Sequence, residues 1–387
     1  MLYFDNAATT YPKPYEVRKA ANSSFLYYGA NPGRSGHSLA MDTAREVFKC
    51  RERAAKLFGC AFPENVIFTK NCTEAINLVI MSIVPGGHCV ISDLEHNSEL
   101  RPLYYLKSKG EADFSVAKVY EGDTDSTLMS FKNAIRKNTK LVAVTGASNV
   151  FGVKPPIKEL AALAHEHGVL FMLDAAQTAG SEKYDMEKDN IDFICAPGHK
   201  GLMGPMGTGL LVAKNPELLR PLLFGGTGTY SLEAKQPDTI PEGLESGTIN
   251  VPGICGLSAG IGRVMREGEE KIASREIKIA QFIYSELVKM KNIRLFTKYP
   301  GKGTHAPVIS FVIGDLTGER TAELLSQRGI AARGGFHCAA LAHRKFATDK
   351  IGTCRISVGP MNTMNEAAKL VKIIYSVSEN IYSQNNS

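Results

Sequence analysis

Apolar runs and helical patterns alternate along the chain from about residue 60 to residue 213. Most of the runs are almost continuously apolar, as expected for strands that are covered on both faces. Strands separated by helices favour an α/β fold with a mostly parallel, doubly wound sheet. The predicted strands are NVIFT, HCVIS, ADFSVAKV, LVAVTGA, GVLFML, DFICA and TGLLVA.

The pattern changes after about residue 215. The stretch FGGTGTYSLEAKQPDTIPEGLESGTINVPG is rich in Gly, Pro and Thr and has no periodicity, which predicts a long functional loop. One long helical stretch, roughly 255–290, follows it. Beyond that stretch we expect a smaller C-terminal α/β domain, with strands at PVISFVIG, IAAR and CRISV and helices over 317–329 and 363–382.

Composition narrows the possible partners. The 387 residues are 44% hydrophobic and 22% charged, and the net charge of +6 comes without a basic run that would favour nucleic acid. We expect no membrane span and no signal peptide. The arrangement of the cysteines predicts a cytoplasmic protein. The eight cysteines are scattered without a CxxC pair or zinc spacing, which favours a reduced protein without a metal site.

Polar residues follow two of the predicted strands. Asp174 ends GVLFMLD, and Lys200 ends the run ICAPGHK. Ligands bind at the C-terminal ends of strands in parallel sheets. Pyridoxal phosphate (PLP) needs a lysine that links to it covalently and an acid that keeps its ring nitrogen protonated. A surface lysine and a helix-capping aspartate are the alternative for each run alone; with His199 and Gln177 beside them, the two runs together favour PLP.

The run ARGGFHCAALAH (332–343) holds a second candidate. A lone cysteine is usually an inert, buried side chain. Cys338, however, follows Gly334 and Gly335, which suggests a loop able to move, and it is close in sequence to His337 and Arg333, cations that favour the thiolate. The segment therefore predicts either a reactive thiol or core packing.

Two further segments suit parts of an amino acid or a cofactor. Arg355 in TCRISVGPMNT offers a fork that can bind a carboxylate, unless it forms a surface salt bridge. The segment VIFTKNCTEAINLVI supplies strand, turn and helix N-terminus, an arrangement that binds phosphate. Thr73 in this turn is either a phosphate ligand or an ordinary N-cap.

These motifs, from YFDNAAT at the N-terminus to CRISVGPMNT, resemble the class V aminotransferase superfamily of fold-type I PLP enzymes across nearly the whole chain. Within it the chain resembles a cysteine desulfurase of the short-loop, SufS-like type. The resemblance implies a fold-type I PLP-dependent transferase. It also implies a large PLP-binding domain over 16–258 and a small domain over 1–15 and 259–387 that carries the cysteine loop.

The resemblance also implies roles for individual residues. Lys200, Asp174, His96 and Cys338 match catalytic positions, with His96 stacking on the cofactor ring and Cys338 forming the persulfide. Arg355, Asn149 and Arg34 match substrate positions, and His37 belongs to the same motif as Arg34. The matching cofactor positions are Lys200, Cys72, Thr73, His96, Asn149, Asp174, Gln177, His199 and Thr248. Thr248 is expected to reach the phosphate of a second subunit, which predicts a homodimer. The chain departs from the family pattern at Gly33, Cys72, Asn97, Ala340 and Met361.

The implied reaction converts L-cysteine to L-alanine and moves sulfur through Cys338 to an acceptor, a protein or thiol whose identity is open, as in iron–sulfur cluster assembly. Alternatives are a selenocysteine lyase, a cysteine sulfinate desulfinase or another class V PLP enzyme. A non-catalytic PLP-binding or sulfur-carrier protein is the alternative of another class. The joint presence of Lys200, Asp174, Arg355 and Cys338 disfavours it.

Overall fold

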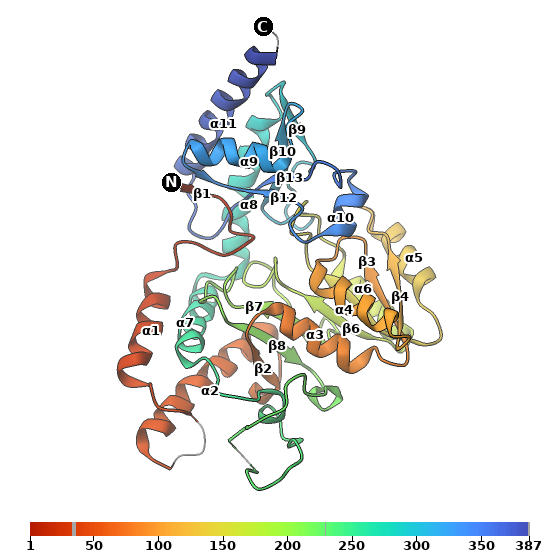
Figure 1. Ribbon diagram of the computed structural model, residues 1–387, viewed down its shortest axis with the longest axis vertical. Coiled ribbons are helices and arrows are strands. Elements are labelled where there is room, and N and C mark those ends of the chain that lie inside the picture. Colours follow the sequence, from red (N-terminus) through yellow and green to blue (C-terminus); the bar gives the residue numbers. More distant parts are fainter. Residues whose placement is uncertain (33–35, 229, 386–387) are drawn as a thin grey trace.

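A seven-stranded sheet forms the centre of the larger part of the molecule (Figure 1). The computed structural model describes residues 1–32, 36–228 and 230–385. The strand order is β2-β8-β7-β6-β5-β3-β4, and only β8 among these strands runs against the others. The predicted mostly parallel sheet is thus confirmed. The strands are β2 (Val66–Thr69), β3 (His88–Ser92), β4 (Asp113–Ala117), β5 (Thr139–Thr145), β6 (Leu170–Asp174), β7 (Phe193–Pro197) and β8 (Gly209–Ala213).

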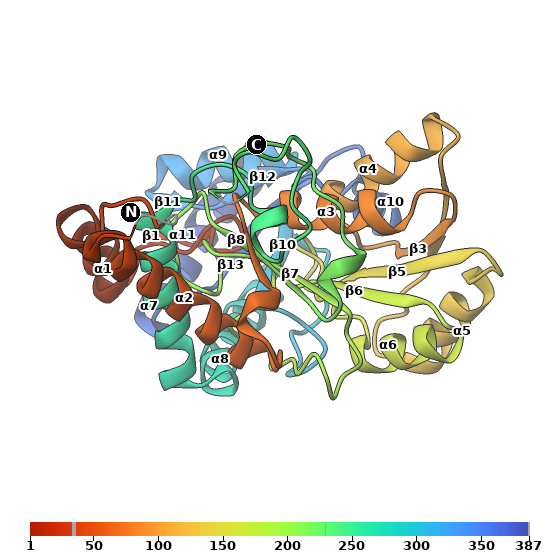
Figure 2. The same cartoon turned by 90° about the horizontal axis from the view of Figure 1, so that it is seen from below.

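Helices cover both faces of this sheet (Figure 2). The side chains of β5 alternate between two apolar clusters: Leu141 and Ala143 join the cluster under α3 (Cys72–Ile83) and α4 (Asn97–Ser108), whereas Val142 and Val144 join the cluster on the other face. This alternation explains why the strands are apolar at nearly every position. The opposite face is covered by α5 (Thr124–Ala134) and α6 (Ile157–Glu166).

The predicted helical stretch over 255–290 is two helices. It comprises α7 (Val251–Glu267) and α8 (Glu269–Leu287), with the break at Gly268. The φ of Gly268 is +86°, a conformation that glycine adopts without a steric cost and that ends α7. Two N-terminal helices that the sequence pattern did not indicate, α1 (Tyr15–Tyr27) and α2 (Ser38–Phe58), pack against α7.

A smaller antiparallel sheet, ordered β12-β13-β10-β9, lies at the other end of the molecule. Its strands are β9 (Ile293–Leu295), β10 (Val308–Ile313), β12 (Arg333–Gly335) and β13 (Thr353–Ser357). The helices of this part of the chain are α9 (Gly318–Gln327), α10 (Ala340–Lys345) and α11 (Met364–Asn385). The predicted strand IAAR is divided, because its first residues form β11 (Ile330–Ala331), which pairs in parallel with β1 (Leu2–Tyr3). The N-terminal segment therefore lies against the C-terminal part of the chain. The proposed domain limits, 16–258 and 1–15 with 259–387, stay a prediction.

Between β8 and α7, the described residues form only the two 3-10 helices Pro216–Leu218 and Glu242–Leu244. Across 1–32, 36–228 and 230–385, no helix is both long and apolar enough to cross a membrane. The same residues contain no group of three or more His, Cys, Asp or Glu side chains placed to hold a metal ion.

Candidate active site

A cavity of about 230 Å³ lies where the two sheets face each other. Its floor includes the last residues of three neighbouring parallel strands, Thr145 of β5, Asp174 of β6 and Pro197 of β7. Parallel sheets bind ligands at this edge. The small sheet contributes Arg333 and Arg355 to the opposite wall. The cavity brings together most of the predicted site residues: Cys72, Thr73, His96, Asn149, Asp174, Gln177, His199, Lys200, Cys338 and Arg355.

Asp174 and Lys200 form the electrostatic centre of the cavity. Asp174 is 2% exposed, and its Oδ1 accepts a hydrogen bond from the backbone N–H of Ala176 at 2.8 Å. Burial raises the pKa of Asp174, while the Ala176 N–H and the charge of Lys200 oppose this shift. Burial lowers the pKa of Lys200, and Asp174 opposes that shift. The amine of Lys200 is therefore easier to deprotonate than that of a surface lysine.

The thiol of Cys72 is turned toward Asp174, at 3.4 Å from Oδ1. Cys72 is the first residue of α3, and the helix is capped by Asn71, whose side chain accepts from the N–H of Glu74. The thiol itself is thus engaged with the carboxylate. A phosphate contact at Cys72 rests on its backbone N–H, next to Thr73 at the positive end of the helix.

Two histidines of the cavity carry uncharged rings near neutral pH. His96 precedes α4, and its Nδ1 accepts from the N–H of Ser98 at 3.1 Å. Burial and then Lys200 lower the pKa of His96 to about 4. Burial and Lys200 also lower the pKa of His199 to about 4. The backbone oxygen of His199 accepts from Lys13 Nζ at 2.7 Å, so this residue is fixed from the N-terminal segment.

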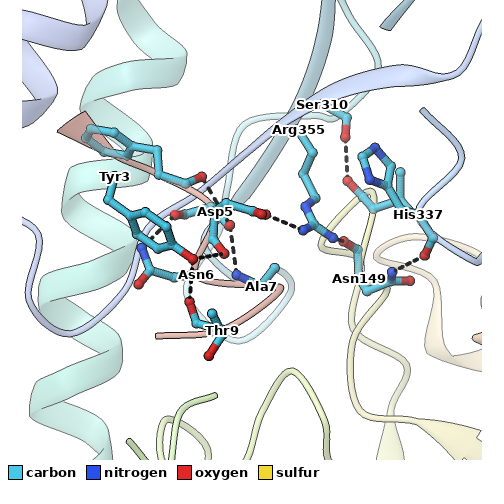
Figure 3. A network of polar contacts seen from close by, with 12 residues as sticks. Tyr3, Asp5, Asn6, Ala7, Thr9, Asn149, Ser310, His337 and Arg355 are labelled. Carbon is cyan, nitrogen blue, oxygen red and sulfur yellow. Dashed lines mark hydrogen bonds and ion pairs between the residues drawn. The ribbon is translucent and has the colours of Figure 1, made fainter. Parts of the chain in front are cut away.

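A polar network links Arg355 to both parts of the molecule (Figure 3). Its Nη1 donates to the carbonyl oxygen of Asn149 at 2.9 Å, and its Nη2 contacts Oδ1 of Asp5 at 2.6 Å. The side-chain amide of Asn149 donates to the carbonyl oxygen of His337 at 2.8 Å. Arg355 is thus part of a buried network that reaches the cysteine segment, which excludes the surface salt bridge considered as its alternative.

Cys338 is the exposed cysteine among eight free cysteines in the described chain. It lies in a turn between β12 and α10, where His337 and Cys338 have φ of 49° and 56°. The expectation that Gly334 and Gly335 belong to a loop is wrong, because both are paired in β12 with β13, and the ability of the Cys338 segment to move stays a prediction. A Cβ on Gly334 would lie 2.6 Å from the Cα of Glu319, so close packing against α9 requires this glycine.

The expected cationic role of His337 is also wrong. His337 is buried, and its Nε2 lies 3.0 Å from the carbonyl oxygen of Thr353. Burial, followed by the charge of Arg355, lowers the pKa of His337 to about 2, so the ring is neutral. Arg333, Lys200 and Arg355 line the cavity with Cys338, so other side-chain cations that favour the thiolate remain near it.

Three of the predicted residues lie elsewhere or outside the described chain. Thr248 lines two other cavities, with Glu245 among the neighbours, and its contact with a second subunit stays a prediction. Arg34 lies outside the described residues. His37 caps α2, where its Nδ1 accepts from the N–H of Ala40.

The residues of the cavity fit PLP. His199 Nδ1 is buried and has no hydrogen-bond partner in the described part of the chain, so it is available to a phosphate beside the N-terminus of α3. Asp174 is a buried carboxylate that a protonated ring nitrogen would match, and Lys200 shares its cavity.

Comparison with known proteins agrees with this fit. The model of the family described as Aminotransferase class-V matches residues 2–370. The chain belongs to the class-V aminotransferase family. The cofactor of this family is PLP.

Several curated and solved proteins to which this chain is similar are described as cysteine desulfurases or probable cysteine desulfurases. The chain is 32% identical to a probable cysteine desulfurase of Methanothermobacter thermautotrophicus, over 97% of this chain and 94% of the relative. It is similar to the apo structure of a cysteine desulfurase from Thermococcus onnurineus, with a TM-score of 0.89, 32% identity and coverage of 98% and 95%. It is also similar to the cysteine desulfurase CsdA of Escherichia coli, with a TM-score of 0.85, 26% identity and coverage of 98% and 94%.

Three carboxylates near the site were not indicated by the sequence motifs: Asp5, Glu95 and Glu99. Asp5 lies within the motif YFDNAAT, and the pairing of the N-terminal segment with the C-terminal part was the signal that could have placed it near Arg355. Glu95 and Glu99 flank His96 and are fully buried. Nothing in the sequence pattern indicated that these two carboxylates are buried.

Proposed function

We propose that this protein is a PLP-dependent cysteine desulfurase that converts L-cysteine to L-alanine and takes the sulfur onto Cys338 as a persulfide. The observation that carries the proposal is a single cavity lined by Lys200, Asp174, Arg355 and Cys338. Three of these suit any PLP enzyme that acts on an amino acid. The exposed thiol is the addition that a desulfurase needs and a transaminase does not.

The residues present would hold the cofactor in a defined way. Lys200 would link to it, Asp174 would pair with its ring nitrogen, and the ring of His96 would stack on it. Thr73, the backbone N–H of Cys72, and His199 would hold the phosphate, and Gln177 and Asn149 would lie near its phenolic oxygen. When bound, PLP supplies an electron sink that makes the α-proton of an amino acid acidic.

The residues of this chain perform the remaining tasks. Arg355 binds the α-carboxylate of L-cysteine through two parallel N–H groups. Lys200 Nζ accepts the α-proton, a role consistent with the lowered pKa of its buried amine. The buried carboxylate of Asp174 stabilises positive charge at the ring nitrogen. Asn149 connects these tasks, because its carbonyl oxygen holds Arg355 and its amide holds the turn of Cys338.

Sulfur transfer follows at Cys338. The thiolate attacks the sulfur of the substrate, an S–S bond forms, and the C–S bond breaks. The electron pair of the broken bond remains with the substrate carbon, which takes up a proton and leaves as L-alanine. The persulfide then passes its outer sulfur to an acceptor thiol or protein. Exposure of Cys338 supports this transfer, since an acceptor must reach it.

The proposal includes a homodimer in the cytoplasm. Large apolar side chains of α1, α2 and the loop after β8 are exposed, among them Phe25, Leu26, Phe224 and Leu232. These segments lie at the same end of the molecule (Figure 1). Exposed apolar side chains gathered on one region are typical of protein interfaces. Thr248, near this end, would contact the phosphate of the second subunit. Scattered cysteines favour a reducing compartment.

The function is tested by measuring alanine and sulfide from L-cysteine in the presence of a thiol reductant. We expect equal amounts of both products, and none from Lys200→Ala. Parallel assays with selenocysteine and cysteine sulfinate separate the alternatives, whose leaving atoms can depart without a protein thiol. Alanine from those two substrates but not from L-cysteine would reject the proposal. Light scattering on the active enzyme tests the dimer: a fully active monomer would reject it.

A further inference from the structure

Asp5 is held in a fixed place behind the cavity by the N-terminal segment. β1 pairs with β11, and Asp5 itself bridges to Ser357, the last residue of β13, which also carries Arg355. The hydroxyl of Tyr3 donates to the carbonyl oxygens of Asp5 at 3.1 Å and of Thr9 at 2.9 Å. Figure 3 shows the side chain of Asp5 directed toward the guanidinium of Arg355. Asp5 is therefore built into the structure and does not reach Arg355 by chance from a free terminus.

The guanidinium of Arg355 is only partly occupied. Arg355 is 2% exposed and has five N–H donors. One of them donates to the carboxylate of Asp5 and one donates to the carbonyl oxygen of Asn149. Its Nε has no partner within the described ranges. Arg355 lines the cavity and Asp5 does not. Asp5 thus holds the guanidinium from behind and fixes its plane, and further N–H donors remain for a ligand.

We propose that Asp5 is a positioning residue that limits how tightly Arg355 holds the α-carboxylate of the substrate and product. This inference rests on the proposed function, which gives Arg355 the carboxylate. Asp5 already neutralises the buried cation. A second carboxylate therefore joins a pair whose net charge is zero, and it meets the negative charge of Asp5 across the same guanidinium.

The consequence concerns turnover. L-cysteine and L-alanine carry the same α-carboxylate, so an unpaired buried arginine would retain the product as firmly as it binds the substrate. Uniform tight binding of substrate and product does not accelerate the chemical step. With Asp5 present, the guanidinium is oriented for two parallel hydrogen bonds while its electrostatic attraction is reduced, so the product can leave.

The test uses Asp5→Asn in the PLP-loaded enzyme, because the amide keeps an oxygen near Arg355 and removes the charge. We expect the Kd for L-alanine, measured by calorimetry, to fall about tenfold, which corresponds to about 1.4 kcal/mol. Without L-alanine, the unfolding midpoint of the variant should fall, since a buried arginine loses its counter-ion. Asp113→Asn is the matched control: it removes the same charge from an exposed group of ion pairs with Lys107 and Arg136, and it should leave the Kd unchanged.

If Asp5 had a purely structural role, the Kd for L-alanine would not fall in the variant. Loss of orientation alone would leave the Kd unchanged or raise it, and either result overturns the proposal. If Asp5→Asn does not fold, Asp5→Ser purified with L-alanine carries the same test, because a ligand stabilises the folded state by mass action. Failure of both variants to fold would show that Asp5 serves folding and would also overturn it.

The test separates this inference from the proposed function. L-alanine contains no sulfur, so its binding does not depend on desulfuration. A tenfold gain in affinity in an enzyme that makes no alanine from L-cysteine would reject the desulfurase and keep the role of Asp5. Normal desulfuration by a variant whose affinity for L-alanine is unchanged would keep the desulfurase function and reject the role of Asp5.

Discussion

The backbone N–H of Asn97 donates to the carbonyl oxygen of Cys338 at 2.8 Å. Asn97 is the first residue of α4, immediately after His96, so one hydrogen bond connects the turn of the thiol to the segment that carries His96. The Asn149 amide, 2.8 Å from the carbonyl oxygen of His337, forms a second tie. The turn is therefore held by consecutive carbonyl oxygens, with the exposed thiol between the two parts of the molecule.

Asn97→Pro tests the first tie. Proline is tolerated at the first position of a helix, and His96 has φ −75° and ψ 157°, which a following proline allows. The substitution removes the N–H and places ring carbon where the carbonyl of Cys338 lies. We expect persulfide formation on Cys338 to slow by on the order of ten- to a hundredfold, because small misplacements of a reacting group cost that much.

The control is Asn97→Ala, which keeps the N–H and should form the persulfide at close to the wild-type rate. Rapid-mixing kinetics followed by mass spectrometry of the GGFHC peptide measures the rate. Binding of L-alanine should be equal in both variants. Equal persulfide rates in the proline and alanine variants would show that the hydrogen bond does not position the thiol.

Cys338→Ala separates amino-acid binding from sulfur transfer. Lys200, Asp174 and Arg355 do not need the thiol, so L-cysteine should still change the visible absorbance of the PLP-loaded variant. Sulfide should fall to the level of the background, and trapping in the wild type should add one sulfur to the peptide that contains Cys338. A persulfide on another cysteine would reject this assignment.

The central sheet could be predicted because its strands are local, continuous apolar runs, and local patterns survive folding. HCVIS and TGLLVA became β3 and β8 within the predicted ranges. The break at Gly268 was missed because the apolar periodicity of α7 and α8 continues across it. Strand pairs formed by two or three residues, such as β1 with β11, leave no periodicity to detect.

Some residues of the site could be predicted from the sequence, and others could not. The large-sheet residues Asp174 and Lys200 could be predicted because each follows a strand, where the fold itself collects ligands. The partners of Arg355 could not, since Asp5 is 350 positions away and reaches it only through tertiary pairing. The expected charge of His337 failed for a related reason: proximity in sequence does not indicate burial, and burial sets its pKa.

Asp174→Asn tests the role of the buried carboxylate. The amide oxygen can still accept from the Ala176 N–H and the Cys72 thiol, so the variant should fold and bind PLP. A neutral amide cannot stabilise a protonated ring nitrogen as a carboxylate does, and we expect turnover of L-cysteine to fall about a hundredfold or more. Alanine formation at the wild-type rate would show that Asp174 only caps the following turn.

The buried carboxyl groups of Glu95 and Glu99, which lie close to His96 in the sequence, predict that the stability of the fold depends on pH. Glu95 and Glu99 are 0% exposed and stand four residues apart across the start of α4. The Oε2 of Glu95 accepts from the N–H of Thr145 at 2.9 Å, which ties α4 to the end of β5. Burial raises the pKa of Glu95 to about 7, and burial together with Glu95 raises the pKa of Glu99 well above its ordinary value. Asp174 acts in the same direction on both.

The sign of the effect follows from these raised values. A carboxyl group whose pKa is higher in the folded state binds its proton more strongly there, so it stabilises the fold at low pH. This contribution is lost as the pH rises from the ordinary carboxyl pKa through the folded value. The unfolding midpoint of the wild type should therefore fall between pH 5 and pH 8.

Glu99→Gln removes the part of this dependence that comes from Glu99, because the amide is neutral at every pH, has nearly the same shape and can donate to Glu95. The part that comes from the burial of Glu95 remains. At pH 8 the variant should unfold roughly 1 °C above the wild type for each kcal/mol regained, because the unfolding entropy of a 387-residue chain is large, and at pH 5 the two should agree. Differential scanning calorimetry at both pH values measures this. Glu111→Gln, which alters an exposed carboxylate in the segment between α4 and β4, is the control and should shift neither midpoint. A Glu99→Gln variant that is destabilised equally at both pH values would show that the protonation of Glu99 does not control the stability of the fold.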